Sequence, residues 1–192
     1  IDSYSPAREI ETRCDREYDF NGHVEKLDRS DVCADELWLA FDIEACKGGS
    51  VKGFVNPLED SVTQIGNTLY DSNYETLDRR VFSMGGSVAK LPHDIHVQVF
   101  TDERKMLLAW RDYIVEKDPD VFTGYNIDGF DWWYLFTRAK KLGIDKEFAA
   151  FSRDLNRPCV LKKAHFQSAA KGAREDYELY CEGRFSCDMY KV

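Results

Sequence analysis

A nine-residue segment from Leu37 to Ala45 constrains the fold of this chain more than any other stretch. Its sequence, LWLAFDIEA, contains neither Gly nor Pro, and its large apolar residues predict a strand that is buried on both faces. Two acids interrupt the apolar run. Side chains two residues apart on a strand point to the same side, so Asp42 and Glu44 place two carboxylates on one face.

Two neighbouring carboxylates need compensation if they are buried. An unpaired buried carboxylate is costly, and two that lie close together also repel each other. A divalent cation compensates for both effects, so the pair suggests a metal site. The alternative is that the strand frays at Asp42 and that both acids are solvated. The segment alone does not separate these two interpretations.

Composition and charge indicate a folded globular chain with one core. Of the 192 residues, 43% are hydrophobic and 32% are charged, which excludes a disordered chain. The net charge of -9 argues against a broadly basic surface that binds nucleic acid. The exception is a group of basic residues near the end of the sequence: Lys162, Lys163, Lys171, Arg174 and Arg184. These residues either follow a nucleic-acid backbone or lie on a solvated loop or hairpin.

Cysteine spacing and hydropathy exclude several other classes of protein. No C-x-x-C pair occurs, so we expect reduced thiols in an intracellular protein rather than a zinc site. No apolar run is long enough to span a membrane, no signal peptide is visible, and no membrane association is expected. The Gly-rich stretch 46–53 fits neither nucleotide-binding fingerprint, and we expect a flexible connection there.

Strands and helices alternate along the remaining sequence. After the first strand, we expect strands at 62–70 and 79–84, which would continue an antiparallel meander, and further strands at 97–100 and 120–125. A helix begins at Thr101 or Asp102 and ends before Pro119. Its apolar face recurs at spacings of three and four residues: Met106, Leu107, Trp110, Tyr113 and Ile114.

A second stretch, GYNIDGFDWWYL at 124–135, carries a further candidate acid. The chain leaves a strand, turns through 126–129 and enters a helix that runs to about Leu142, where Gly143 stops it. Asp131 lies in the first turn of that helix. It either stabilises the helix N-terminus or acts as a third carboxylate beside Asp42 and Glu44, because sites in α/β sheets gather beyond the strand ends.

These two stretches resemble the exonuclease motifs of family B DNA polymerases. Phe41-Asp42-Ile43-Glu44 is similar to the first motif, and the segment from Tyr125 to Asp131 is similar to the second. Four further segments resemble segments of delta-type polymerases and occur in the same order: 14–19, 60–66, 166–168 and 183–188. The resemblance therefore covers nearly the whole chain. One departure is Trp133, where the family often has Pro; it removes no candidate ligand.

The resemblance implies an α/β fold with an RNase H-like mixed sheet flanked by helices. Residues 1–36 would be the end of an N-terminal domain, and 37–192 a 3′–5′ exonuclease domain truncated before the third motif. That motif, a Tyr followed four residues later by the last Asp of the site, is expected downstream of Val192, and Asp188 is expected to begin another element rather than to bind metal. The palm motifs are absent too, so we expect a polymerase fragment that is weak or inactive alone.

The resemblance also implies the chemistry. Two Mg²⁺ ions, for which Mn²⁺ substitutes, would support hydrolysis of the 3′-terminal phosphodiester of DNA during replication. Asp42 would bridge the ions, Glu44 would hold the first and Asp131 would support the second. Asn126 and Phe130 would position the single-stranded 3′ end of the primer.

Partners and location follow from the same resemblance. The full-length DNA-directed DNA polymerase would bind deoxynucleotides, and a sliding clamp would bind regions outside this sequence. The expected location is intracellular, in the nucleus or in a viral replication compartment. Two other functions stay open at this point: a stand-alone exonuclease with the same acids, and a catalytically silent scaffold that keeps the exonuclease fold.

Overall fold

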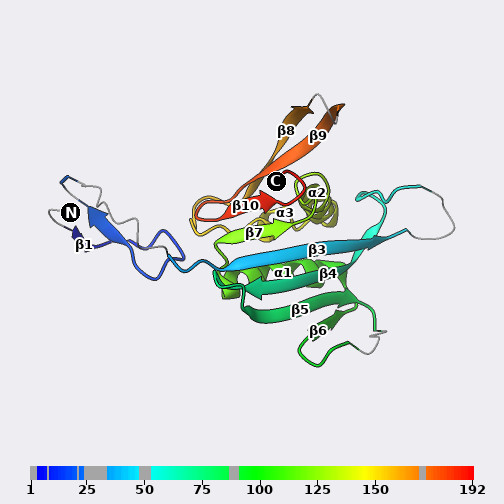
Figure 1. The fold of residues 1–192 in the computed structure, drawn as a ribbon, viewed down its shortest axis with the longest axis horizontal. Coiled ribbons are helices and arrows are strands. Elements are labelled where there is room, and N and C mark those ends of the chain that lie inside the picture. Colours follow the sequence, from blue (N-terminus) through cyan, green and yellow to red (C-terminus); the bar gives the residue numbers. More distant parts are fainter. Residues whose placement is uncertain are drawn as a thin grey trace.

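A six-stranded mixed sheet forms the centre of the molecule (Figure 1). This computed structural model describes residues 4–7, 9–20, 22–23, 34–47, 53–86, 91–168 and 172–192. Across the sheet, the strands lie in the order β10 (Phe185–Asp188), β7 (Val121–Gly124), β3 (Trp38–Cys46), β4 (Ser61–Tyr70), β5 (Thr76–Met84) and β6 (His96–Phe100). The β3–β4–β5 meander is antiparallel, and the remaining neighbours are parallel. The predicted α/β class with a mixed sheet is confirmed.

Three helices occur in the described part of the chain: α1 (Glu103–Lys117), α2 (Asp131–Leu142) and the short α3 (Asp145–Phe148). The two longer helices pack on the same face of β3, because the Phe41 ring lies 5.3 Å from Trp110 of α1 and 4.7 Å from Trp132 of α2. None of the described helices is long and apolar enough to cross a membrane.

Strand β3 is buried on one face only, which corrects the expectation of burial on both faces. Leu39, Phe41 and Ile43 are buried beneath the helices. Asp42 and Glu44 point to the other face and are exposed. The difference arises because α1 and α2 cover a single face of β3, and the acids occupy the uncovered face near the end of the strand.

Helix α1 follows its sequence pattern closely. Asp102 is the N-cap, and its side chain accepts a hydrogen bond from the backbone N–H of Arg104 at 2.8 Å. The helix ends where Asp118 adopts a left-handed conformation, one residue before Pro119. All five residues of the predicted apolar face are buried. Trp110 belongs to the core, and its indole N–H donates to Asn67 Oδ1 at 2.8 Å.

Two small hairpins lie outside the central sheet. Strands β8 (Val160–Ser168) and β9 (Gly172–Tyr180) pair antiparallel and project away from the sheet above β10 in Figure 1. Strands β1 (Tyr4–Pro6) and β2 (Tyr18–Phe20) form a second antiparallel pair. This pair lies beyond the N-terminal end of β3, at the left of Figure 1. The β8–β9 hairpin lies close to α2 and to the C-terminus, and it therefore borders the part of the fold that carries Asp131.

A buried ion pair fixes α2 against α1 and β4. Arg138 of α2 donates from Nε and Nη2 to the carboxylate of Glu103 at 2.8 and 2.7 Å. The same carboxylate accepts from the backbone N–H of Val62 at 2.9 Å, and Arg138 also donates to the carbonyl of Pro57 at 3.1 Å. Both charges are therefore paired and hydrogen-bonded, which burial requires.

We expect Arg138→Met to lower the free energy of unfolding by about 3–5 kcal/mol, because it leaves the Glu103 carboxylate buried without its partner. Denaturant unfolding measures the change. The matched control is Arg79→Met, which breaks a solvent-exposed pair with Asp94 and should cost at most about 1 kcal/mol. Equal losses in the two variants would contradict the proposed role of the buried pair.

Candidate active site

The site forms where β7 leaves the edge of β3. Strand β7 pairs with only the first three residues of β3, Trp38 to Ala40. Beyond that point, the backbone N–H of Ile43 donates to Asp131 Oδ1 at 3.1 Å. Because Ile43 lies between Asp42 and Glu44, this bond places the first residue of α2 beside the strand segment that carries the other two acids.

The turn between β7 and α2 determines where Asp131 lies. A Cβ at Gly124 would lie 2.6 Å from the carbonyl oxygen of Phe41, so only glycine allows this close approach to β3. Asn126 then adopts a left-handed conformation with φ of 64°. The backbone N–H groups of Gly129 and Phe130 both donate to the Asn126 carbonyl, which closes the turn immediately before the helix.

Burial and neighbouring charge perturb the Asp131 carboxyl. The residue is 2% exposed, and its desolvation, followed by the negative charge of Asp42, raises its pKa to about 7. The hydrogen bond from Ile43 opposes this shift. Partial burial also raises the pKa of Asp42. The two carboxyl groups therefore interact electrostatically, as expected for acids that share a site.

The three predicted acids are neighbours, but they do not form a closed cage. Asp42 and Glu44 lie on the uncovered face of β3, and Asp131 lies at the strand edge between them. Within the described residues, no three His, Cys, Asp or Glu side chains are close enough together to hold a metal ion. His93 and His96, which share an H-x-x-H spacing, are both exposed and lie outside any helix.

The predicted substrate-positioning residues flank Asp131. Phe130 immediately precedes α2, and its ring meets the ring of Phe54 edge-to-face at 5.5 Å. Phe54 is 78% exposed, and its proximity to Phe130 was not predicted, because it follows the Gly-rich stretch in a segment with no regular pattern. The side-chain oxygen of Asn126 is buried and accepts no hydrogen bond within the described residues. An aromatic pair with one exposed ring thus lies next to Asp131, whereas the unpaired oxygen of Asn126 is buried.

Asp188 has a structural role that the sequence did not predict. Its carboxylate accepts hydrogen bonds from the backbone N–H groups of Asn126 at 2.7 Å, Asp128 at 3.2 Å and Tyr190 at 2.9 Å. The expectation that Asp188 begins another element is wrong, since it is the last residue of β10 and holds the turn before α2. Strand β10, four residues long including Asp188, is too short to show a clear alternating pattern.

The basic group near the end of the sequence is not one surface. Arg184 has a fully buried side chain that pairs with Asp118 at 2.8 Å, so neither alternative, contact with a nucleic-acid backbone or a solvated position, holds for this residue. Lys162 lies on β8 with its ammonium 3.9 Å from the centre of the Tyr180 ring, which agrees with the hairpin alternative. Lys171, the Arg174 side chain and residues 48–52 of the Gly-rich stretch lie outside the described parts of the chain.

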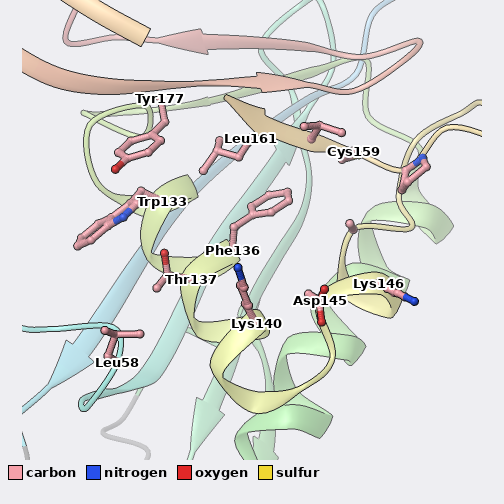
Figure 2. A pocket seen from close by; sticks show the side chains of 13 residues that line it. Leu58, Trp133, Phe136, Thr137, Lys140, Asp145, Lys146, Cys159, Leu161 and Tyr177 are labelled. Carbon is pink, nitrogen blue, oxygen red and sulfur yellow. The ribbon is translucent and has the colours of Figure 1, made fainter. Parts of the chain in front are cut away.

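An apolar groove of about 900 Å³ separates α2 from the β8–β9 hairpin (Figure 2). Trp133 and Phe136 of α2 line one side, and Leu161 and Tyr177 of the hairpin line the other. Trp133, the departure from the family pattern, stacks on Tyr177 with ring centres 6.2 Å apart. None of the three candidate acids lines this groove, so it is separate from the candidate active site.

We expect Gly124→Ala to lower the free energy of unfolding by about 1–3 kcal/mol, because the added methyl group meets the Phe41 carbonyl and the Ile127 side chain. Thermal or denaturant unfolding measures the loss. Gly66→Ala is the control, since a Cβ there has no neighbour within 4 Å. If both variants were as stable as the wild type, the close contact between Gly124 and the Phe41 carbonyl would not contribute to stability.

Asp131 should make stability depend on pH when a chelator removes divalent cations. Its folded pKa of about 7 lies above the ordinary value of 3.8, so the folded state binds the proton more tightly. The contribution is greatest below pH 4 and is lost as the pH rises through 7, by about 2–4 kcal/mol. Urea unfolding of wild type and Asp131→Asn from pH 4 to 8 measures the difference.

The asparagine variant keeps an oxygen that can accept from Ile43, but it does not titrate. We therefore expect its stability, relative to that of the wild type, to rise between pH 4 and 8. Parallel pH profiles for the two proteins would show that Asp131 is not desolvated in the folded chain.

Comparisons with known proteins agree with the fold and the site geometry. Residues 3–192 match the family described as DNA polymerase family B, exonuclease domain. The chain is 40% identical to the DNA polymerase delta catalytic subunit of Glycine max over 156 residues, which are 80% of this chain and 14% of that protein. For the Drosophila melanogaster subunit, identity is 34% over 189 residues, 95% of this chain and 17% of that protein.

A solved structure of a family B DNA polymerase is also similar to this chain. The family B DNA polymerase from the hyperthermophilic archaeon Pyrobaculum calidifontis shares 28% identity and a TM-score of 0.50, over 82% of this chain and 16% of that chain. The present sequence thus spans less than a fifth of each of these three relatives. Together with the mixed sheet, these matches show that the chain belongs to the exonuclease-domain family of family B DNA polymerases.

Proposed function

We propose that this chain is the proofreading exonuclease portion of a longer DNA-directed DNA polymerase, and that Asp42, Glu44 and Asp131 support hydrolysis of the 3′-terminal phosphodiester of DNA. The hydrogen bond between Ile43 and Asp131 is the observation that carries the proposal. It joins two acidic motifs that lie far apart in the sequence, and a purely structural acid at a helix N-terminus would not require this position.

The chemistry of the donor set suits a divalent cation, although the three carboxylates do not converge closely enough in this structure to hold one. The three side chains offer only oxygen ligands, which Mg²⁺ and Mn²⁺ prefer. Burial and the charge of Asp42 disfavour ionised Asp131, and a bound cation would reverse that penalty. We propose that Asp42, Glu44 and Asp131 hold two Mg²⁺ ions. When bound, such ions favour ionisation of the attacking water and stabilise the charge on the leaving oxygen.

The remaining residues would orient the DNA end. Phe130 and the exposed Phe54 present aromatic surface beside the acids, and a stacked base gains about 1–3 kcal/mol irrespective of its sequence. Asn126 would help to orient the DNA end through the turn that it forms before α2, because its unpaired side-chain oxygen is buried. Sequence-tolerant contacts of this kind suit an enzyme that must remove any mispaired nucleotide.

The proposal extends to partners, boundaries and location. The substrate is the single-stranded 3′ end of a primer, and deoxynucleotides and a sliding clamp would bind other parts of the polymerase. Residues 37–192 contain the whole central sheet, whereas 4–20 contain a separate two-stranded sheet, which supports a boundary near residue 36. We propose an intracellular location in replication, and the eukaryotic delta-subunit relatives favour the nucleus over a viral replication compartment.

We expect Asp131→Asn in the intact polymerase to slow removal of 3′-terminal nucleotides from single-stranded DNA at least about 100-fold with Mg²⁺. The asparagine retains the shape and the acceptor of the carboxylate but not its charge. Single-turnover release of a labelled 3′ nucleotide measures the rate. Asp112→Asn, on the exposed face of α1, is the control and should leave the rate unchanged.

Two outcomes would contradict the proposal. Wild-type protein that binds a single-stranded end but releases no nucleotide with either Mg²⁺ or Mn²⁺ would indicate a catalytically silent scaffold. Full activity of Asp131→Asn would remove Asp131 from the reaction. In either case, the pH-dependent stability predicted above would still report whether the carboxylate is buried.

A further inference from the structure

Two cysteines face each other at the base of the β8–β9 hairpin. Val160 and Tyr180 form the last pair in the hairpin register, and Cys159 and Cys181 are the next residues outward on the two sides. Their sulfur atoms lie 3.0 Å apart, and both are free thiols. The antiparallel register thus brings two nucleophilic side chains together from opposite strands.

The surroundings make the two thiols unequal. Cys159 is 3% exposed, whereas Cys181 is only partly buried. A hydrogen bond with the Cys159 thiol, together with the nearby cations of Arg184 and Arg153, lowers the pKa of Cys181. Burial raises the pKa of Cys159. The more accessible sulfur is therefore also the one that forms a thiolate more readily.

The asymmetry comes mainly from the burial of Cys159 and from the hydrogen bond between the two thiols. The side chain of Arg184 adds a positive charge that lowers the pKa of both thiols. It is fully buried, and its Nε donates to the carbonyl of Phe151 at 3.0 Å. The Cys181 sulfur lies 4.0 Å from the same carbonyl, and the backbone N–H of Arg184 donates to the Cys181 carbonyl at 3.1 Å. A fixed cation thus lies in the immediate surroundings of this thiol, and such surroundings favour thiol–disulfide exchange.

We propose that Cys159 and Cys181 form a reversible redox site, in which oxidation by a low-molecular-weight disulfide joins the two ends of the hairpin. This inference goes beyond the hydrolytic function and does not depend on it. The general expectation of reduced thiols would then hold for this pair only under reducing conditions.

The exchange balances without any other reactant. The Cys181 thiolate attacks one sulfur of the small disulfide, breaks its S–S bond and releases one small thiolate. The Cys159 thiol loses its proton to solvent and attacks the Cys181 sulfur of the mixed disulfide, which releases the second small thiolate. Two protein thiols are oxidised to one disulfide, and the small disulfide is reduced to two thiols.

The covalent link would fix the hairpin beside α2. Tyr177 of β9 donates its backbone N–H to the carbonyl of Asp128 at 2.9 Å and stacks its ring on Trp133. Separation of β8 and β9 at their base would disturb these contacts, and a disulfide between Cys159 and Cys181 prevents that separation. The link also restricts the unfolded chain, so the oxidised protein should be more stable than the reduced protein.

The test titrates the intact protein with mixtures of reduced and oxidised glutathione, followed by acid quenching, alkylation and peptide mass spectrometry. We expect a linked Cys159–Cys181 peptide that lacks the mass of two hydrogens and reverts when reduced glutathione is restored. Oxidation should also raise the thermal midpoint by roughly 5–10 °C. Cys181→Ser should abolish both effects, and Cys14→Ser, which removes an exposed thiol elsewhere, should retain both.

The linked peptide is assayed in the wild type, so a folding defect in a variant does not decide the result. The proposal is overturned if both thiols remain fully alkylatable in the most oxidising buffer, or if the link forms only in denaturant. It is also overturned if Cys181→Ser, shown to be folded by circular dichroism, retains the full oxidative shift in thermal midpoint.

Discussion

The hydrogen bond from the Ile43 N–H to Asp131 determines the arrangement of the candidate site. Strand β7 leaves the edge of β3 after Ala40, and the first residue of α2 takes up the next exposed part of that edge. One carboxylate oxygen therefore completes the backbone bonding of the strand while the acid remains beside Asp42. Desolvation, followed by the charge of Asp42, raises the pKa of Asp131 to about 7, a penalty that a bound cation would offset.

The rest of the fold holds α2 where this bond requires it. Trp132 packs against Phe41 on the inner face of β3, so the helix is anchored one residue after Asp131. The ion pair between Arg138 and Glu103 fixes the next part of the helix to α1. On the other side, Asp188 binds the backbone of the turn before α2. Core packing, a buried charge pair and a turn cap thus position the same helix N-terminus.

Local patterns in the sequence predicted most of the fold and the three acids. The face of α1 was visible because its spacing repeats over several turns, and Asp131 was visible because a strand, a turn and a helix start precede it. The roles of Arg184 and Asp188 were not visible, because their partners lie far away along the chain and short β10 has little pattern. One-sided burial of β3 depends on where the helices pack, which no single strand encodes.

We propose that two distant acidic motifs converge to bind divalent cations at the edge of β3. Anomalous diffraction from crystals of the intact protein soaked in Mn²⁺ would locate these cations. We expect manganese peaks within coordination distance of the carboxylates of Asp42, Glu44 and Asp131. A fully soaked crystal with no peak at these side chains, or with manganese only elsewhere, would contradict it.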